Sequence, residues 1–340
     1  MKNHHVWRRG LYYRRIQHPI RQGYYSNLIN QMKRVVTYMK KERKVYKNFG
    51  ECLFLSDDHV TLGVTLEVGP RIIYLAAKDG ENLFFEDTQG ELTMDGPEMQ
   101  EAFGPESVFK LYGGHRLWVS PESIFSYYPD NEPVTLTENG NTFRFSAPVQ
   151  RVTGLQCEME VVFKEGGHIT VNHYITNRSQ KEQTLALWAL TVTDKRGRSF
   201  LKWNSHKTGF LSNRIISLWD YTDITDPRAL FGRDWFELRQ DPGIDCAFKM
   251  GADIRSGFVV LLNKNTAFIK RFAYENDAIY PDGGCNYETY TNAHMMEIET
   301  LSPLRALAPG QTASHTEHWQ VIPNVPQDIS AETFENNYLI

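Results

Sequence analysis

Residues 155–179, LQCEMEVVFKEGGHITVNHYITNRS, decide the fold class. They contain two runs rich in β-branched and aromatic residues, separated by the glycine pair Gly166-Gly167. Paired glycines admit the positive φ angles of a tight turn, so this stretch predicts two strands joined by that turn. On the second strand His173 shares a face with Val171 and Ile175, which favours a hydrogen-bonded core histidine over a metal ligand.

Short β-rich runs separated by Gly, Asp, Asn and Pro continue along the chain from Val45 onward. Helical periodicity is hard to find outside residues 94–104, where we expect one short helix capped by Asp95 with Pro97 in its first turn. No Pro/Ser-rich linker and no repeat divides the chain after residue 48. The sequence therefore predicts one large all-β sandwich of mostly antiparallel strands in two stacked sheets. Further strands are predicted within residues 59–69, 71–86, 141–149, 183–193, 256–274 and 294–304.

The composition limits the class of protein. The chain has 340 residues, of which 41% are hydrophobic and 13% aromatic, enough for a substantial core. No run approaches the roughly 18 apolar residues of a membrane span, and no charged-then-apolar leader is present, so we expect a soluble, cytoplasmic protein with no membrane partner. The four cysteines lie far apart and without the close pairs of metal sites, which predicts free thiols, mostly in the core.

The charge is unevenly distributed. Residues 1–47 carry 13 Lys or Arg against the single acid Glu42, whereas the remaining chain carries 24 basic and 40 acidic residues. We interpret residues 1–47 as a basic arm, either disordered or the product of a start assigned upstream of Met32, with residues 48–325 as the domain and 326–340 as a tail. A basic arm can bind nucleic acid through phosphate contacts, but the acidic domain argues against a polyanion partner, so no nucleic-acid partner is predicted. The oligomeric state is left open.

Two carboxylates share one strand face late in the chain. In residues 293–304, AHMMEIETLSPL, period two puts Glu297 and Glu299 on one face, about 6.6 Å apart along the strand at about 3.3 Å per residue. Met295 and Leu301 bracket them, which suggests a partly buried face where a carboxylate has a raised pKa and can act as a base. A solvated sheet face explains the same pattern without any function.

A second candidate stretch is YGGHRLWVSPE, residues 112–122. Its glycine pair permits a sharp turn of the backbone or a close approach of the backbone to another group. His115, Arg116 and Trp118 follow directly after it. Polar groups next to a flat apolar ring suit a polar ligand with an apolar face, such as a sugar ring. A loop packed onto the domain would give the same string.

Residues 280–290, YPDGGCNYETY, contain a Pro-Asp-Gly-Gly turn immediately before the carboxylate strand. Such a turn would carry Asp282 and Asn286 to the rim of a site, where both can bond sugar hydroxyls. An ordinary surface loop is the alternative.

Three cations lie in constrained or apolar surroundings: Lys249 in CAFKMG, Lys270 in AFIKRFAY and Arg71 in GPRIIYL. They can protect strand edges or reach from the core to the surface. If they face inward, they would instead prepare a site for a hydroxyl-rich or anionic ligand.

Several chemistries have no support. The chain contains no Gly-rich phosphate loop before a helix, no GxSxG elbow and no CxxC pair. His315 and His318 in HTEH point to opposite faces of a strand, so a shared metal is not expected there. We predict neither a metal nor a cofactor.

Five segments carry a family resemblance: GPRIIYLAAKDGENLFFE (residues 69–86), GGHRLWVSPE (113–122), ITVNHYITNRSQKEQTLALWALT (169–191), YPDGG (280–284) and MEIETLSPLRALAPGQTASHTEHWQVI (296–322). In this order they resemble the galactose mutarotase-like superfamily, and within it most closely the DUF4380 family of bacterial proteins. The resemblance spans about residues 49–322. It implies a β-supersandwich whose concave face binds carbohydrate.

In the mutarotases a late glutamate removes the proton of the anomeric hydroxyl while a histidine protonates the ring oxygen, and no cofactor is required. Glu299 is similar to that glutamate, Arg71 resembles the arginine of their early segment, and His115 resembles a substrate-binding histidine. The strand that would carry the acid histidine corresponds to QTLALWALTVT, with Trp188 or Ala189 at its position. Either His115 has taken the acid role or the mutarotation machinery is absent.

The resemblance therefore implies a carbohydrate-binding protein, with the enzyme hypothesis of an aldose 1-epimerase-like isomerase that acts by general acid-base catalysis on a small-molecule sugar. Its alternatives are a non-catalytic sugar-binding protein and, ranked lowest, a glycan hydrolase or lyase. In the enzyme hypothesis Glu299 is the base, Glu297 its substitute, and His115 the acid. The residues expected to bind the substrate are Arg71, Arg116, Trp118, Lys249, Lys270, Asp282 and Asn286.

Overall fold

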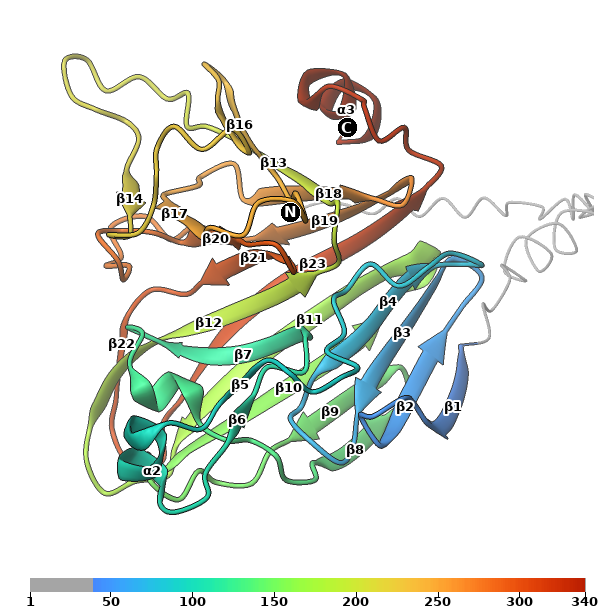
Figure 1. The fold of residues 1–340 in the computed structure, drawn as a ribbon, viewed down its shortest axis with the longest axis vertical. Helices are drawn as coiled ribbons and strands as arrows, with labels where there is room; N and C mark the ends of the chain where they lie inside the picture. Colours follow the sequence, from blue (N-terminus) through green and yellow to red (C-terminus); the bar gives the residue numbers. More distant parts are fainter. Residues whose placement is uncertain (1–38, 340) are drawn as a thin grey trace, which may run out of the picture. The chain divides into compact units, whose positions relative to one another are not determined.

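The structure of the protein, a computed structural model, describes residues 39–339. Within this range the chain forms two large antiparallel sheets (Figure 1). Listed by hydrogen-bonded neighbours, the 11-stranded sheet comprises β1 (Lys40–Val45), β2 (Glu51–Ser56), β3 (Val60–Thr65), β4 (Ile72–Ala77), β7 (Gly114–Ser120), β12 (Gln183–Thr193), β21 (Met296–Leu301), β20 (Tyr287–Thr291), β17 (Phe248–Ala252) and β14 (Ile216–Leu218), with β22 (Arg305–Leu307) also paired to β12. The 10-stranded sheet comprises β15 (Ala229–Phe231), β16 (Trp235–Arg239), β13 (Arg198–Lys202), β18 (Phe258–Asn263), β19 (Thr266–Phe272), β23 (Thr312–Pro323), β11 (His168–Asn177), β10 (Leu155–Phe163), β9 (Thr142–Ser146) and β8 (Thr135–Asn139).

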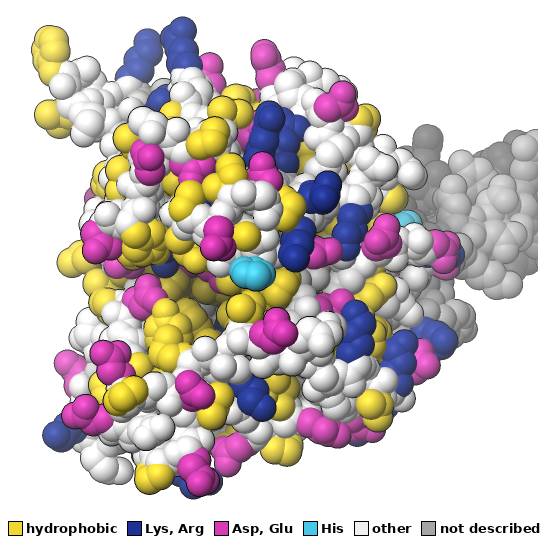
Figure 2. All heavy atoms as spheres, viewed as in Figure 1, with side chains coloured by type: hydrophobic (Ala, Val, Ile, Leu, Met, Phe, Trp, Pro, Cys, Tyr) yellow, Lys and Arg dark blue, Asp and Glu magenta, His cyan; other side chains and the backbone are white. Residues whose placement is uncertain are grey.

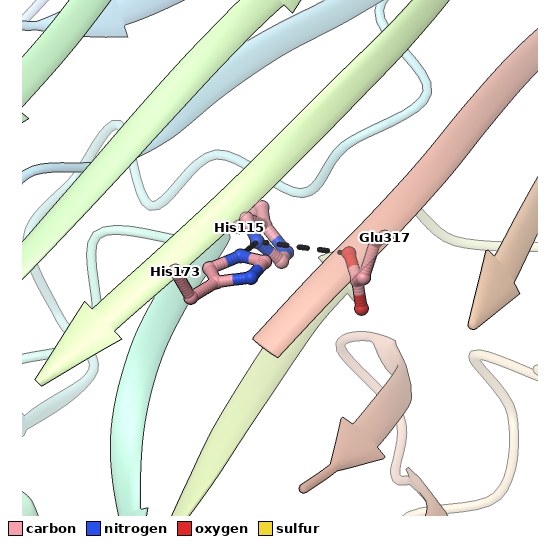
Figure 3. Close-up of side chains that lie close together, drawn as sticks. All are labelled: His115, His173 and Glu317. Carbon is pink, nitrogen blue, oxygen red and sulfur yellow. Dashed lines mark hydrogen bonds and ion pairs between the residues drawn. The ribbon is translucent and has the colours of Figure 1, made fainter. Parts of the chain in front are cut away.

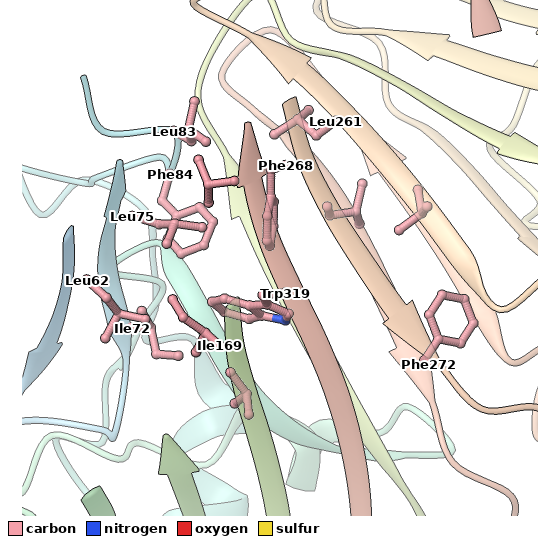
Figure 4. Packing of buried hydrophobic residues seen from close by; sticks show 14 of the residues in the cluster. Leu62, Ile72, Leu75, Leu83, Phe84, Ile169, Leu261, Phe268, Phe272 and Trp319 are labelled. Atoms are coloured by element: carbon pink, nitrogen blue, oxygen red, sulfur yellow. The ribbon is translucent and has the colours of Figure 1, made fainter. Parts of the chain in front are cut away.

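The two sheets share one hydrophobic core. In Figure 4, Leu62 and Leu75 of the 11-stranded sheet lie in the same cluster as Phe268 and Trp319 of the 10-stranded sheet. Phe84, which follows β4, contacts both rings edge-on, with centroids 5.8 Å from Phe268 and 5.9 Å from Trp319. Burial of aromatic and branched side chains from both inner faces is the main stabilising term of such a sandwich, and the predicted fold class is confirmed.

The hairpin predicted at residues 155–179 is present as β10 and β11. Leu155 pairs with Asn177, and along β10 buried residues alternate with half-buried ones, as expected for a strand with one face in the core. The connecting turn, η2 (Glu165–Gly167), uses φ angles of 74° and 75° at its two glycines. The other predicted strand segments also contain strands.

A small layer covers part of the outer face of the 11-stranded sheet, the face turned away from the shared core. Met99 and Phe109 of this layer pack with Trp118 and Trp188 of the sheet, so the outer face is apolar here. The elements of the layer are β5 (Thr93–Met94), α2 (Pro97–Phe103), β6 (Phe109–Lys110) and the 3-10 helix η1 (Ile124–Tyr127).

Helix α2 is the predicted short helix, but its N-cap is Gly96 and not Asp95. Pro97 is the first helical residue, as expected. The residue before a proline is held in extended conformations, so Gly96, with φ of -65° and ψ of 177°, marks the boundary, and no side chain caps the helix.

The ends of the domain differ from the predicted boundaries. Strand β1 lies inside the segment that we interpreted as a basic arm, and it pairs along its length with β2. Helix α3 (Ala331–Tyr338) lies in the predicted tail and is anchored by Phe334, which is buried against Phe200 with ring centroids 5.4 Å apart. Residues 1–38 of the predicted arm lie outside the described residues.

The prediction for the thiols is confirmed: all four cysteines are free, and Cys52, Cys157 and Cys285 are buried while Cys246 is exposed. In residues 39–339 no helix combines the length and the apolar character that crossing a membrane requires.

Candidate functional site

The outer face of the 11-stranded sheet carries most of the polar candidates. Alternation along β21 puts Glu297 and Glu299 on this face, while Met296 and Ile298 enter the shared core, as the sequence pattern predicts. Register then brings side chains from neighbouring strands beside them. Trp118 pairs with Trp188, Glu288 with Glu299, Tyr290 with Glu297 and Lys249 with Tyr290.

Apart from Glu288 and Glu299, these side chains border a pocket of about 480 Å³, called here the aromatic pocket. On this side of the molecule the surface is hollowed, and hydrophobic side chains gather around the hollow (Figure 2). Aromatic rings make up half of the lining, and three of the lining residues are charged. The lining residues are Phe109, Leu111, Trp118, Glu122, Tyr127, Trp188, Leu190, Trp219, Tyr221, Ala247, Lys249, Tyr290, Met295 and Glu297.

Lys249 is the cation of this pocket and contacts several carboxylates. Its Nζ lies 3.0 Å from Glu288 Oε2, 3.6 Å from Glu122 Oε2 and 3.9 Å from Glu299 Oε2. Although burial lowers the pKa of Lys249, the charges of Glu299 and Glu288 outweigh it and raise that pKa. The ammonium is therefore charged throughout the physiological pH range.

The same ammonium packs on aromatic rings. Lys249 Nζ lies 4.6 Å from the ring centroid of Trp188 and 4.5 Å from that of Trp219. These distances are typical of cation–π contacts. The pocket thus holds an ammonium between two indole faces.

Glu297 has the surroundings expected of a group that exchanges protons near neutral pH. Burial and the charge of Glu299 raise the pKa of Glu297 to about 8. Glu297 is 9% exposed and lines the pocket, and within residues 39–339 its carboxylate has no hydrogen bond or ion pair. At pH 7 it is therefore mostly a carboxylic acid.

Glu299 lies deeper. It is fully buried, and Trp188 Nε1 donates a hydrogen bond of 2.6 Å to its Oε2. Burial raises the pKa of Glu299 above its ordinary value, and Lys249 and the Trp188 hydrogen bond offset only part of this rise. Burial likewise raises the pKa of Glu288. Because Lys249 supplies a single positive charge to these buried carboxyl groups, only some of them ionise and the others stay protonated.

Several buried polar atoms around this site have no hydrogen-bond partner within the described part of the chain: Arg116 Nε and Nη1, Trp118 Nε1, Glu288 Oε1 and Glu299 Oε1. Most buried polar groups are satisfied, so unpaired donors and acceptors around one pocket indicate a place that a ligand or water completes. Trp118 also lines the aromatic pocket.

Arg71 and Arg116 lie behind the wall of the aromatic pocket that Trp118 forms, and both pair with Asp130. Arg71 makes a bidentate pair with Asp130, at 2.5 Å and 2.6 Å, and Arg116 lies 3.6 Å from the same carboxylate. Arg116 also stacks under the pocket wall, with its guanidinium carbon 4.4 Å from the Trp118 ring centroid and 4.7 Å from that of Phe109. Arg116 therefore supports the pocket, whereas both terminal nitrogens of Arg71 bind Asp130.

His115 does not lie with Glu299, contrary to the expectation that the two share a site. On β7 it occupies the face opposite to Arg116 and Trp118, and it points into the layer between the sheets, where it is fully buried. Its Nε2 lies 2.7 Å from His173 Nε2 (Figure 3). Lys270 lies in the same layer, 2.8 Å from Glu317, and not in the aromatic pocket.

These residues form a buried polar cluster of His115, His173, Thr191, Lys270, Thr300, His315 and Glu317. His173 Nδ1 donates to the His315 carbonyl, so its Nε2 accepts from His115, whose Nδ1 accepts from Thr191. Burial lowers the pKa of His115 and His173, which keeps both rings neutral.

The cluster has the residue types of a metal site. His115, His173 and Glu317 offer three ligand atoms within 4.8 Å of one another. The two histidine nitrogens, however, lie at hydrogen-bond distance, and the Lys270 ammonium already pairs with Glu317. The arrangement is that of a self-satisfied hydrogen-bond network, as the sequence favoured for His173.

Asp282 and Asn286 do not line the aromatic pocket. The predicted turn is present, with positive φ at residues 282–284. Asn286 is fully buried and exchanges two hydrogen bonds with the backbone of Ile254, so it holds two segments together. Asp282 accepts from Ser217 through its carbonyl and lies 3.4 Å from Ser120 Oγ.

Four residues in or beside the pocket are absent from the predicted site: Glu122, Glu288, Tyr290 and Trp219. Alternation in YETY, residues 287–290, indicates that Glu288 and Tyr290 share a strand face, so these two residues could have been predicted from the sequence. Glu122 and Trp219 reach the pocket from segments outside the strands, and no periodicity identifies such positions.

No protein-family model and no curated protein sequence matches the chain. Among solved structures, it is similar to a galactose mutarotase-like protein from Clostridium acetobutylicum, with a TM-score of 0.51 and 9% identity over 84% of this chain and 99% of that one. It is also similar to a galactose mutarotase related enzyme from Lactobacillus acidophilus, with a TM-score of 0.51 and 10% identity over 81% and 99%.

A third similar structure is a TPR-domain containing protein from Parabacteroides distasonis, with a TM-score of 0.53 and 12% identity over 83% of this chain. The chain spans about half of that protein, 48% of its length. Together these structures give the chain the galactose mutarotase-like β-sandwich fold. Identities this low establish the fold alone.

Proposed function

We propose that the aromatic pocket binds a carbohydrate and that its carboxyl groups interconvert the anomers of the sugar, as an aldose 1-epimerase does. One observation carries the proposal. Glu297 has no partner among residues 39–339 and lies in a wall of aromatic rings, with burial and Glu299 raising its pKa to about 8. A group of this kind can give and take a proton at neutral pH.

The walls suit a sugar ring. Trp118, Trp188 and Trp219 provide flat apolar faces on which the C–H face of a pyranose can pack. The unpaired Trp118 Nε1 is a donor for a ring hydroxyl. A pocket with apolar walls and a few convergent polar groups is typical of small-molecule sites.

The acid of this mechanism is Glu297. In its protonated form it donates a proton to the ring oxygen of the sugar, and the bond between that oxygen and the anomeric carbon breaks. The proposal thus replaces His115, which lies on the other side of the sheet, as the proton donor. Trp188, which with Ala189 is one of the two residues at the strand position where the resembling mutarotases have their acid, contributes a ring wall and a hydrogen bond to Glu299.

The base is Glu299. It removes the proton of the anomeric hydroxyl as the C1 carbonyl forms, and after rotation about the C1–C2 bond the two proton transfers run in reverse. The Trp188 hydrogen bond and the Lys249 ammonium at 3.9 Å stabilise its ionised form. Its Oε1 has no partner among the described residues and is the oxygen available for the substrate. We also propose that the chain is a member of the DUF4380 family, which its sequence resembles, and that this family shares the function.

A second candidate function is sugar binding without catalysis. It is favoured by the complete burial of Glu299, which requires the pocket to open slightly before a hydroxyl reaches Oε1. Loss of one general acid or base typically lowers rates by about 10² to 10⁴, while binding contacts stay intact.

The test is anomer exchange measured by NMR over a panel of free and phosphorylated aldoses. The proposal expects acceleration above the buffer rate that falls at least about 100-fold in Glu297→Gln and in Glu299→Gln. The matched control is Glu332→Gln, an exposed glutamate on α3 that should keep the full rate. Sugar-dependent line broadening without acceleration would select the binding protein, and no effect of any sugar would refute both.

A further inference from the structure

Carboxylates outnumber cations around the aromatic pocket. Among the described residues, Glu297 and Glu122 line it, and Glu288 and Glu299 lie directly behind it. Lys249 is the one cation in its lining. The guanidinium of Arg116 lies behind Trp118, beside Asp130.

The pocket already recognises an ammonium. Lys249 Nζ sits between the indole rings of Trp188 and Trp219, close to carboxylates, which is the arrangement that proteins use to bind organic ammonium groups. The ring of Tyr221 belongs to the same lining.

Glu122 is the carboxylate that a ligand can reach most easily. Its side chain is 35% exposed, whereas Glu288 and Glu299 are buried. It accepts a hydrogen bond from Tyr127, another wall residue, and lies 3.6 Å from Lys249. Glu297 adds a second carboxylate of the lining, more than nine-tenths buried and without a partner among the described residues.

From this geometry we infer that the pocket selects a sugar bearing a free amino group, whose ammonium is held by Glu122 and the aromatic walls. The inference rests on the proposed carbohydrate function and names the substrate class of that site. An ammonium there would pair with the Glu122 carboxylate and favour ionisation of Glu297, whereas a neutral sugar would leave Glu297 protonated and Glu122 would repel an anionic sugar.

Such a ligand would also tune the proposed acid. The charge of Glu122 is one of the causes that raise the pKa of Glu297. A bound ammonium beside Glu122 lowers that pKa toward neutrality, where a general acid-base group is most effective.

The experiment is isothermal titration calorimetry of the full chain with glucosamine, glucose and N-acetylglucosamine at pH 6.5, where the amine of glucosamine is protonated. We expect glucosamine to bind at least about 10-fold more tightly than glucose, and N-acetylglucosamine to show no such gain. Glu122→Gln should reduce the glucosamine affinity to that of glucose. Glu332→Gln should keep the full preference.

The outcomes separate this inference from the function on which it rests. Equal affinities for the three sugars, or a glucosamine preference that persists in Glu122→Gln, would overturn the inference while leaving carbohydrate binding intact. Absence of binding by all three, at concentrations where the NMR panel also shows none, would overturn both. If Glu122→Gln folds poorly, Tyr127→Phe removes the hydrogen bond to Glu122 and should lower the glucosamine preference in part.

Discussion

Glu288 and Glu299 lie directly opposite each other on β20 and β21, and Lys249 reaches both, at 3.0 Å and 3.9 Å. Like charges in this position destabilise a sheet unless a counter-charge or a proton intervenes. The ammonium of Lys249 therefore has a structural role as well as its place in the pocket wall.

Replacement of Lys249 by Met should lower the free energy of unfolding by about 3 kcal/mol at pH 8, because it leaves buried carboxylates without their counter-charge. The loss should be much smaller at pH 5, where the carboxyl groups bind protons. Urea denaturation at the two pH values measures this difference. Lys207→Met, at an exposed lysine, is the matched control, and equal losses at both pH values would contradict the argument.

The stability of the protein should fall between pH 7 and 8.5. Burial raises the pKa of Glu297 to about 8 from an ordinary value near 4.5, so the folded state holds a proton that the unfolded state has released. Stability from this group is complete below pH 4.5 and is lost as pH rises through 8, with about 1 kcal/mol of the loss falling in this window. Glu297→Gln should remove that part of the slope; an unchanged slope would show that Glu297 titrates normally.

Trp118→Phe should weaken sugar binding about fivefold. The substitution keeps an aromatic face but removes Nε1, the unpaired donor proposed to bond a hydroxyl, and a hydrogen bond of this kind contributes about 1 kcal/mol. Calorimetry or NMR titration measures the affinity, with Trp235→Phe on the 10-stranded sheet as the control. Unchanged affinity would remove Trp118 from the site.

Glu317→Gln should destabilise the domain by about 4 kcal/mol, because Lys270 would stay buried without its charge partner. Against the effect of burial, Lys270 holds the pKa of Glu317 below its ordinary value. The stability from this pair is therefore present above pH 4.5 and is lost as pH falls. Glu335→Gln, which breaks the partly exposed pair with Lys202, should cost less than about 1 kcal/mol in the same denaturation assay.

Local patterns predicted the sandwich and one strand of the site. The alternation of Met295, Glu297, Glu299 and Leu301 depends only on the period of a strand, and the structure keeps it. The turns also follow from local chemistry, since glycine and proline restrict the backbone without reference to the rest of the fold.

The directions in which the His115 and Lys270 side chains point were not predicted from the residues around them. Period two already separates His115 from Trp118 on a strand, so grouping them by their proximity in sequence obscured the opposite directions of these side chains. Lys270 points inward because Glu317, from a distant strand, lies beside it to form the pair. Contacts between residues so far apart in sequence come from the strand order, which local patterns do not specify.

The edge strand β1 has a further consequence. All six of its residues are exposed, four of them are basic, and Lys41 bonds Glu138 on β8, the edge of the other sheet, at 2.7 Å. No strand within residues 39–339 pairs with the other edge of β1. An open strand edge is a template for pairing between molecules, and closely spaced like charges oppose that pairing. At this side of the sandwich, growth of the sheet into an aggregate would bring two rows of lysine and arginine together, so the same strand that completes the sheet also protects the folded protein from polymerisation.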